Sequence, residues 1–281
     1  MIKLVLCDVD GTLIPLGKRG PSIRTMRAIS LVQQAGIRFG LATGRDIVEL
    51  MQLFDGNDLP FRTGILSNGK KILVDGELVR LSLIDNEGLA RVVDALAEFP
   101  QTFVTAYPLN TTTSNPIYCM GTTREELEPW AKTYSFTGRI VSKVPDEKII
   151  GATIACAASE DVLAQVKQRA LEAYPGFDIV EPAARWWDIL PKGLNKGTAL
   201  GLLLQELGIS ASEAMMFGDA DNDLAILSRL ENSAVVSGAT PAAKAAAHWQ
   251  IGACEDDAVA QALEELARSA KDGSTPAFMQ E

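Results

Sequence analysis

Hydrophobic and polar positions follow two different rhythms along this chain. Near the start, continuous apolar runs at residues 2–7 and 37–41 alternate with segments 23–32 and 46–54, whose apolar side chains recur at helical spacing. Continuous apolar runs are typical of strands buried on both faces, as in a parallel sheet. Strands that alternate with helices therefore predict an α/β fold over this part of the chain.

A different rhythm occupies the middle of the chain. Residues 64–81 predict a small meander with Asn68-Gly69 and Asp75-Gly76 as its turns. Beyond it the strands follow one another without regular parallel crossovers, which favours an α+β unit. Its expected helices lie near residues 86–98, 123–134 and 160–174, and its expected strands at 102–107, 117–120, 149–155, 177–180 and 186–190.

The α/β rhythm returns at Lys196, with a helix over 197–207 and a strand over 214–217. Another strand, two more helices and a polar tail follow, at residues 233–236, 241–247, 257–270 and 271–281. The simplest organisation is a doubly wound parallel-sheet core with an inserted α+β domain. We expect residues 1–83 and 187–281 to form the core and residues 84–186 to form the insertion.

Composition narrows the classes of function. Two domains suit 281 residues, and 47% apolar residues exclude bulk disorder. A formal net charge of −10 argues against a nucleic-acid or anionic-membrane partner. The sequence contains neither an export signal nor a run of 18 apolar residues, so we expect a cytoplasmic protein. With His248 as the one histidine and no CxxC pair, any metal should be hard and oxygen-bound.

Four polar clusters stand at or near strand ends. They are Asp8-Val9-Asp10-Gly11-Thr12, Thr43-Gly44-Arg45, Lys196-Gly197, and residues 219–223. Each cluster taken alone also suits a turn or a helix cap. Because ligands of open α/β sheets bind outside the carboxyl ends of the strands, the four clusters together predict one shared site.

The residue types in these clusters suit phosphoryl transfer. A carboxylate can attack phosphorus and form an aspartyl phosphate, which water then hydrolyses. Asp8 and Asp219 offer two hard oxygens for Mg²⁺, and a lysine can bridge the nucleophile and the phosphate. A second carboxylate two residues beyond the nucleophile can protonate the leaving oxygen and later activate water.

In their order along the chain, these clusters resemble the four motifs of the haloacid dehalogenase-like superfamily. The chain is most similar to the Cof-like sugar-phosphate phosphatases with a type IIB cap, in which the cap lies between the second and third motifs. The resemblance implies that Asp8 is the nucleophile and Asp10 the general acid/base. It further implies that Lys196, Thr43 and Gly44 bind phosphate and that Asn222 contacts phosphate or a metal-bound water. The implied Mg²⁺ ligands are Asp8, the Asp10 carbonyl and Asp219, with Asp223 in support. Arg45 is left open between a surface residue and a substrate contact.

We therefore expect a Mg²⁺-dependent phosphatase that acts on a small phosphorylated metabolite, with a sugar phosphate as the favoured substrate. Two alternatives stay open. A phosphomutase would use the same aspartyl phosphate. A non-catalytic protein that binds a phosphorylated metabolite would have the same fold without turnover. We expect a monomer or a homodimer.

Overall fold

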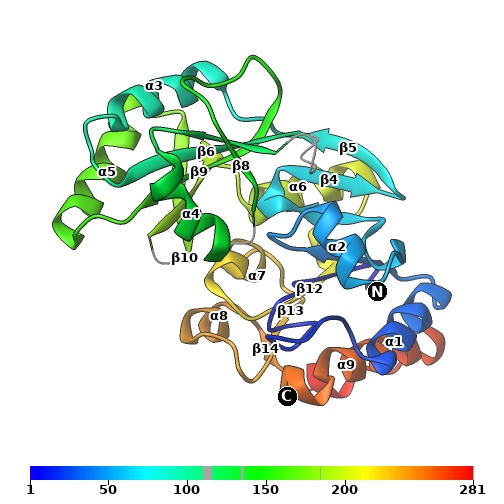
Figure 1. Cartoon of the computed structure of the whole chain (residues 1–281). Helices are drawn as coiled ribbons and strands as arrows, with labels where there is room; N and C mark the ends of the chain where they lie inside the picture. The colour runs from blue at the N-terminus through cyan, green and yellow to red at the C-terminus, as the bar shows by residue number, and fades with distance from the viewer. Residues whose placement is uncertain (110–115, 134–135, 184, 281) are drawn as a thin grey trace. The chain divides into compact units, whose positions relative to one another are not determined.

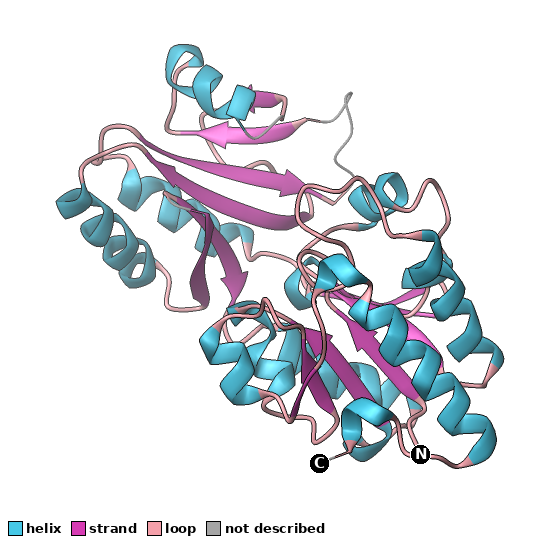
Figure 2. Cartoon of the chain, turned by 90° about the horizontal axis from the view of Figure 1, so that it is seen from below, coloured by secondary structure: helices cyan, strands magenta, loops and turns pink. Residues whose placement is uncertain are grey.

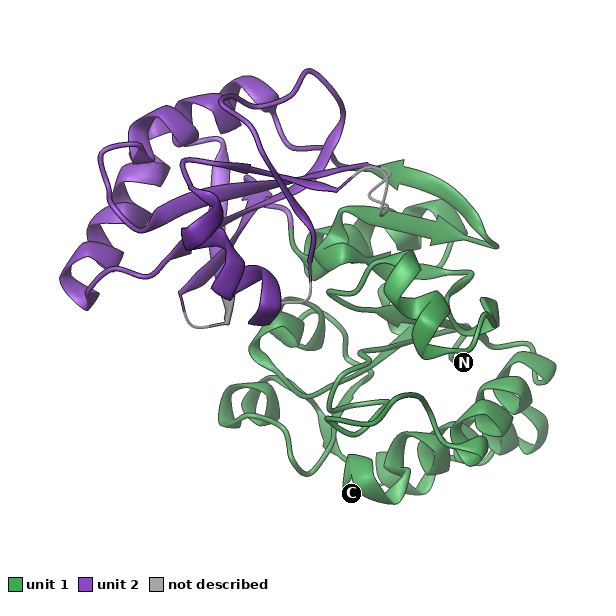
Figure 3. Cartoon of the chain, in the orientation of Figure 1, with its two compact units in different colours: residues 1–81, 195–281 green, residues 82–194 purple. Residues whose placement is uncertain are grey.

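The computed structural model describes residues 1–109, 116–133, 136–183 and 185–280. The chain divides into two compact units, shown in Figure 3: Met1–Leu81 with Asn195–Glu281 form unit 1, and Ser82–Leu194 form unit 2. The chain returns to unit 1 later than the predicted residue 187, because strand β11 (Trp186–Pro191) pairs with β9 and β10 of unit 2. Residue 134, at the end of one predicted helix, lies outside the described residues.

Unit 1 is built on an eight-stranded sheet in the order β14-β13-β12-β1-β2-β3-β4-β5. All neighbouring pairs from β14 to β3 are parallel, and β4 and β5 extend the sheet as antiparallel hairpins. The strands are β1 (Leu4–Cys7), β2 (Arg38–Ala42), β3 (Gly64–Leu66), β4 (Lys71–Val74), β5 (Glu77–Leu81), β12 (Ala214–Gly218), β13 (Ser233–Val235) and β14 (Trp249–Gln250). Figure 2 shows helices on both sides of these strands. The predicted fold class is confirmed.

Two helices of unit 1 begin at capping residues that the sequence carries. Ser22 caps α1 by accepting a hydrogen bond from the Thr25 amide at 3.0 Å, and Asn195 caps α6 through a capping box with Thr198. Gly208 ends α6 in the left-handed conformation. The helices are α1 (Ile23–Gln34), α2 (Ile47–Leu53), α6 (Lys196–Leu207), α7 (Leu224–Leu227), α8 (Pro241–Ala246) and α9 (Ala258–Asp272).

The predicted polar tail is wrong for residues 277–279. Ala277–Met279 form a short 3-10 helix, and Phe278 and Met279 are partly buried against the core of unit 1. The Phe278 ring lies 6.0 Å from Phe217 and 6.5 Å from Trp249, centroid to centroid. Aromatic burial therefore holds a segment that looked frayed in the sequence.

Unit 2 is an α+β unit with its own six-stranded sheet, in the order β10-β11-β9-β6-β7-β8. Its pairs are antiparallel, except that β7 and β8 are parallel. Besides β11, its elements are α3 (Asn86–Leu96), β6 (Thr102–Pro108), β7 (Ile117–Met120), α4 (Arg124–Thr133), β8 (Gly138–Ile140), β9 (Ile149–Cys156), α5 (Glu160–Ala173) and β10 (Phe177–Ala183). Figure 1 shows its helices α3 and α5 side by side. In the described part of the chain, no helix combines the length and the apolar character that crossing a bilayer requires.

Candidate active site

Three of the predicted clusters follow neighbouring parallel strands of unit 1. Asp8 comes directly after β1, Thr43 after β2 and Asp219 after β12, and β1 lies between the other two strands. The Asp8 amide continues the ladder by donating to the Phe217 carbonyl at 2.9 Å. Because the strands are parallel, their carboxyl ends meet at one edge of the sheet, as the sequence predicted for the shared site.

Lys196 connects the third cluster to the first and the fourth. Its side chain is 1% exposed, and its Nζ donates to Asp8 Oδ1 at 2.7 Å and to Asp223 Oδ1 at 2.8 Å. Burial alone favours the neutral amine, but the attraction of the two carboxylates outweighs it and raises the pKa of Lys196 above its ordinary value. Lys196 is therefore a fixed cation between two buried carboxyl groups.

The carboxylates of Asp8, Asp219 and Asp223 gather around this cation. One ligand atom of each lies within 4.8 Å of the others. Burial raises the pKa of Asp8 to about 7; Lys196 opposes this shift, and the neighbouring carboxylates reinforce it. Burial also raises the pKa of Asp219. An all-oxygen donor set whose negative charges repel one another fits a hard divalent cation such as Mg²⁺.

Asp223 has both carboxylate oxygens occupied by protein donors. Oδ1 accepts from Lys196, and Oδ2 accepts from the amides of Asp219 and Ala220 at 3.1 and 3.3 Å. A Cβ at Gly218 would lie 2.7 Å from Asp223 Oδ2, so only glycine fits there. This geometry gives Asp223 the work of fixing the Asp219 loop and the lysine, which agrees with a supporting rather than a direct part in holding a metal.

Asp10 and Arg45 form a two-pronged ion pair. Arg45 donates from Nε to Asp10 Oδ2 and from Nη2 to Asp10 Oδ1, both at 2.7 Å. The hydrogen bond to Asp10 raises the pKa of Arg45. The side chain that the sequence left between a surface and a substrate role thus holds the predicted acid/base carboxylate in place.

The other predicted phosphate-binding residues differ in their exposure. The Thr43 side chain is buried, and its Oγ1 accepts from the Arg45 amide at 3.1 Å, so its hydroxyl hydrogen is left to donate elsewhere. Gly44 is exposed beside it. Asn222 is exposed in the 3-10 turn Asp221–Asp223, next to the buried Asp223.

Two supporting contacts were missed in the sequence. Thr12 donates from Oγ1 to Asp219 Oδ1 at 2.6 Å. Lys71, which is buried in β4, pairs with both oxygens of Asp46 at 2.7 and 2.8 Å, and Asp46 follows Arg45 and caps α2. Thr12 stood within a motif and could have been singled out. Lys71 carried a weaker signal, a lysine in an otherwise apolar strand.

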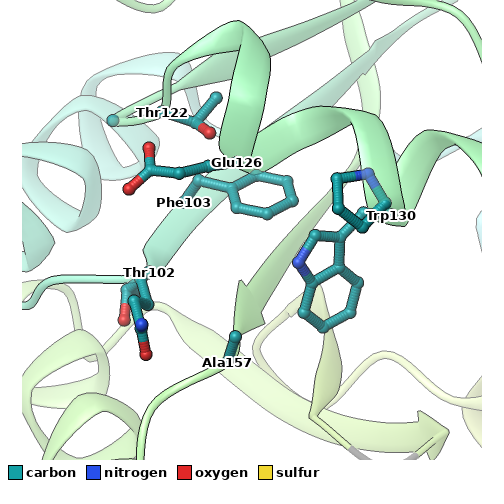
Figure 4. Close-up of a pocket in the computed structure, with 9 residues that line it drawn as sticks. Thr102, Phe103, Thr122, Glu126, Trp130 and Ala157 are labelled. Carbon is teal, nitrogen blue, oxygen red and sulfur yellow. The ribbon is translucent and has the colours of Figure 1, made fainter.

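Unit 2 contains a cavity of about 230 Å³ between α4 and the ends of β6, β7 and β9 (Figure 4). Trp130 and Phe103 form its aromatic wall (Figure 4). Its polar members are Gln101, Thr102, Thr122 and Glu126. None of the residues predicted to bind phosphate or metal lines this cavity.

Comparisons with known proteins agree with this geometry. The profile of the haloacid dehalogenase-like hydrolases matches residues 5–263. The chain is 24% identical over 268 residues to the 5-amino-6-(5-phospho-D-ribitylamino)uracil phosphatase of Escherichia coli, covering 94% of this chain and 96% of that protein. It is 28% identical to the HMP-PP phosphatase of Klebsiella pneumoniae, covering 94% and 95%. The solved structure of a sugar phosphatase of HAD subclass IIB superposes with a TM-score of 0.72 at 21% identity, covering 93% and 98%.

Sequence and structure together therefore define the class of protein. It is a phosphatase fold in which a second unit is inserted between the second and third motifs. The chain belongs to the haloacid dehalogenase-like hydrolases. The resemblance noted in the sequence is confirmed, and so is the predicted enzyme class, a phosphatase of this family.

Proposed function

We propose that this protein hydrolyses the phosphomonoester of a small metabolite with Asp8 as a covalent nucleophile. The observation that carries the proposal is the placement of a buried Lys196 between Asp8 and Asp223, with the Asp219 carboxylate beside them. A salt bridge that served only stability could lie at the surface and would not require a buried lysine. A buried cation shared by carboxylates at a sheet edge suits the binding of an anionic substrate.

In the first half-reaction, a carboxylate oxygen of Asp8 attacks phosphorus and the bond from phosphorus to the leaving oxygen breaks. The buried Lys196 stabilises the ionised nucleophile and the charge on the phosphoryl oxygens. Asp10 donates a proton to the leaving oxygen. Arg45 donates to both oxygens of the Asp10 carboxylate, so its guanidinium must release at least one of them before that proton transfer.

In the second half-reaction, water attacks phosphorus and the bond from phosphorus to Asp8 breaks. Asp10 now accepts a proton from that water, which reverses its part in the first step. Inorganic phosphate leaves, and Asp8 is regenerated as a carboxylate. The Thr43 hydroxyl can donate to a phosphoryl oxygen in both steps, because its oxygen already accepts from the Arg45 amide.

We assign the Mg²⁺ site to the carboxylates of Asp8 and Asp219 and the Asp10 carbonyl, with Asp223 fixing the loop behind them. When bound, the ion supplies positive charge that offsets the repulsion between an anionic nucleophile and an anionic substrate. Support comes from the raised pKa values of Asp8 and Asp219, because burial first, and neighbouring carboxylates second, oppose their ionisation unless a cation joins them.

The substrate class follows from chemistry and relatives together. The motif residues can bind only phosphate and metal, and every phosphomonoester offers the phosphate. The two relatives are named for a phosphorylated ribitylaminouracil and for HMP-PP, and the structural neighbour for sugar phosphates. We therefore propose a small phosphorylated metabolite, and among these a sugar phosphate first.

A phosphate-release screen over phosphorylated metabolites, with Mg²⁺ and with excess chelator, tests the proposal. Turnover should require Mg²⁺ and disappear in Asp8→Asn, because an amide cannot form the acyl phosphate. Asp10→Asn should cost about 10²–10⁴ in kcat through lost proton transfer. Asp55→Asn, at an exposed turn, is the matched control and should keep wild-type turnover. Near-normal turnover in Asp8→Asn would exclude the covalent mechanism, and an isomerised product without released phosphate would indicate a phosphomutase.

A further inference from the structure

The turn Ser67–Gly69, between β3 and β4, holds three successive residues with positive φ. The φ angles are 51° at Ser67, 57° at Asn68 and 100° at Gly69. Residues with side chains adopt this region at a cost, and such strain persists where the surrounding structure enforces it.

The turn is held between two predicted parts of the active site. The Ser67 amide donates to the Arg45 carbonyl and the Asn68 amide to the Thr43 carbonyl, both at 3.0 Å. On its other side, a Cβ at Gly69 would lie 2.9 Å from the Asn195 carbonyl, just before Lys196. The turn thus lies against both the Thr43 loop and the start of α6.

The Asn68 carboxamide lies directly against Gly44. A Cβ built on Gly44 would come within 3.3 Å of both Asn68 Nδ2 and Asn68 Oδ1. Oδ1 is buried and has no partner among the described residues. Asn68 is half-buried, and its Nδ2 has no hydrogen-bond partner in the described part of the chain, so its N–H groups remain for a ligand. An amide left unpaired beside a binding loop calls for an explanation other than folding.

We infer that Asn68 is a further substrate-binding residue, which donates from Nδ2 to a phosphate oxygen held by Thr43 and Gly44. The inference rests on the proposed function of that loop. A turn role alone does not account for the residue. Asparagine suits positive φ, but glycine suits it equally and would place no unpaired amide beside the Thr43–Gly44 loop.

The test exploits this equivalence. Asn68→Gly keeps the backbone conformation and removes the amide, whereas Asn68→Asp keeps the shape and places an anion beside the phosphate. Asn68→Gly should leave the melting temperature near the wild-type value and weaken inorganic phosphate binding, measured by calorimetry with Mg²⁺, about 10-fold. Asn68→Asp should weaken it further. Asp55→Gly, an exposed residue with φ of 50°, is the matched backbone control and should bind phosphate as the wild type does.

Unchanged phosphate affinity in Asn68→Gly would overturn the inference. So would unchanged phosphate affinity together with an altered order of preference among substrates, because Asn68 would then contact the leaving group. The readout also separates this inference from the proposed function. A wild-type protein that binds phosphate more tightly than Asn68→Gly, yet turns over no phosphomonoester, would contradict the proposed hydrolysis alone.

Discussion

Asp8 combines two conflicting requirements at the scale of a single residue. Burial favours its neutral form and raises its pKa to about 7, while a nucleophile must be ionised. Lys196 opposes the effect of burial, and Asp223 and Asp219 add to it. A divalent cation at these carboxylates would favour the ionised form, so proton and metal should compete for Asp8.

This competition predicts a pH-dependent affinity for Mg²⁺. Between the usual pKa range of aspartate and about 7, the folded metal-free protein binds a proton at Asp8 that the unfolded chain has released. Protonation of Asp8 therefore stabilises the metal-free fold at low pH, and this contribution is lost as the pH rises through about 7. The Mg²⁺ affinity should rise with pH, by up to about tenfold per unit, and level off above that pKa.

Calorimetry in buffers of different ionisation enthalpy measures both the affinity and the protons released. In Asp8→Asn, the Mg²⁺ affinity should no longer change slope near neutral pH. This variant should also bind Mg²⁺ more weakly than the wild type at all pH values. Asp55→Asn should follow the wild-type curve. A Mg²⁺ affinity that stays constant as the pH is lowered through about 7 and below would show that Asp8 does not share a proton and a metal.

At this scale, the sequence predicted which residues gather but not how they pair. Asp8, Thr43 and Asp219 could be placed because each follows a strand whose direction the pattern already indicated. The Arg45–Asp10 fork and the Thr12–Asp219 hydrogen bond could not, since side-chain rotamers and packing decide them. The pairing of Lys71 with Asp46 depends likewise on where the β3–β4 hairpin folds back.

At the scale of the element, the position of Lys196 depends on how closely α6 packs against α7. A Cβ at Gly197 would lie 2.5 Å from the Ala225 carbonyl oxygen and 2.7 Å from the Ala225 Cβ. The backbone of α7 cannot yield as a flexible side chain would. Gly197 therefore allows the two helices to approach, and it does so one residue beyond the lysine.

Gly197→Ala should consequently destabilise the protein by about 1–3 kcal/mol and reduce kcat, because α6 must move and carry Lys196 with it. Gly201 offers a matched control in the same helix, where a Cβ would meet only Arg229 atoms at 3.9–4.0 Å. Gly201→Ala should stabilise by about 0.5–1 kcal/mol and leave kcat unchanged. Urea unfolding and phosphate release measure both effects. Equal stability of the two variants would contradict this account of the packing.

The elements that the sequence predicted well have strong internal signals. The helices with Ser22 and Asn195 at their caps, and the apolar strands β1 and β2, are examples. Two short strands were missed. Strand β8 has only three residues and β14 only two, and each depends on pairing with a partner distant in the chain. The C-terminal 3-10 helix depends on Phe278 meeting Phe217 and Trp249, contacts that no local pattern reveals.

At the scale of the whole molecule, chemistry and insertion are separate in the chain. Every residue that we assign to the nucleophile, the metal site or phosphate binding lies in unit 1, which has its own hydrophobic core. Unit 2 has a core of its own, formed by α3, α5 and one face of its sheet. The phosphate group is common to all candidate substrates, so we expect residues of unit 2 to select among their leaving groups.

Replacing Ser82–Leu194 with a flexible Gly-Ser linker tests this division of labour. The shortened protein should still release phosphate slowly from an aryl phosphate, whose good leaving group needs little help. It should lose the order of preference among sugar phosphates, because only the phosphate is still recognised. kcat/KM for several sugar phosphates, measured on both proteins, gives the comparison, and circular dichroism of the shortened protein establishes that unit 1 has folded.

The shortened protein carrying Asp8→Asn is the control for its residual activity. If a folded, shortened protein kept the full-length order of preference, specificity would have to reside in unit 1, with Arg45 as the first residue to examine.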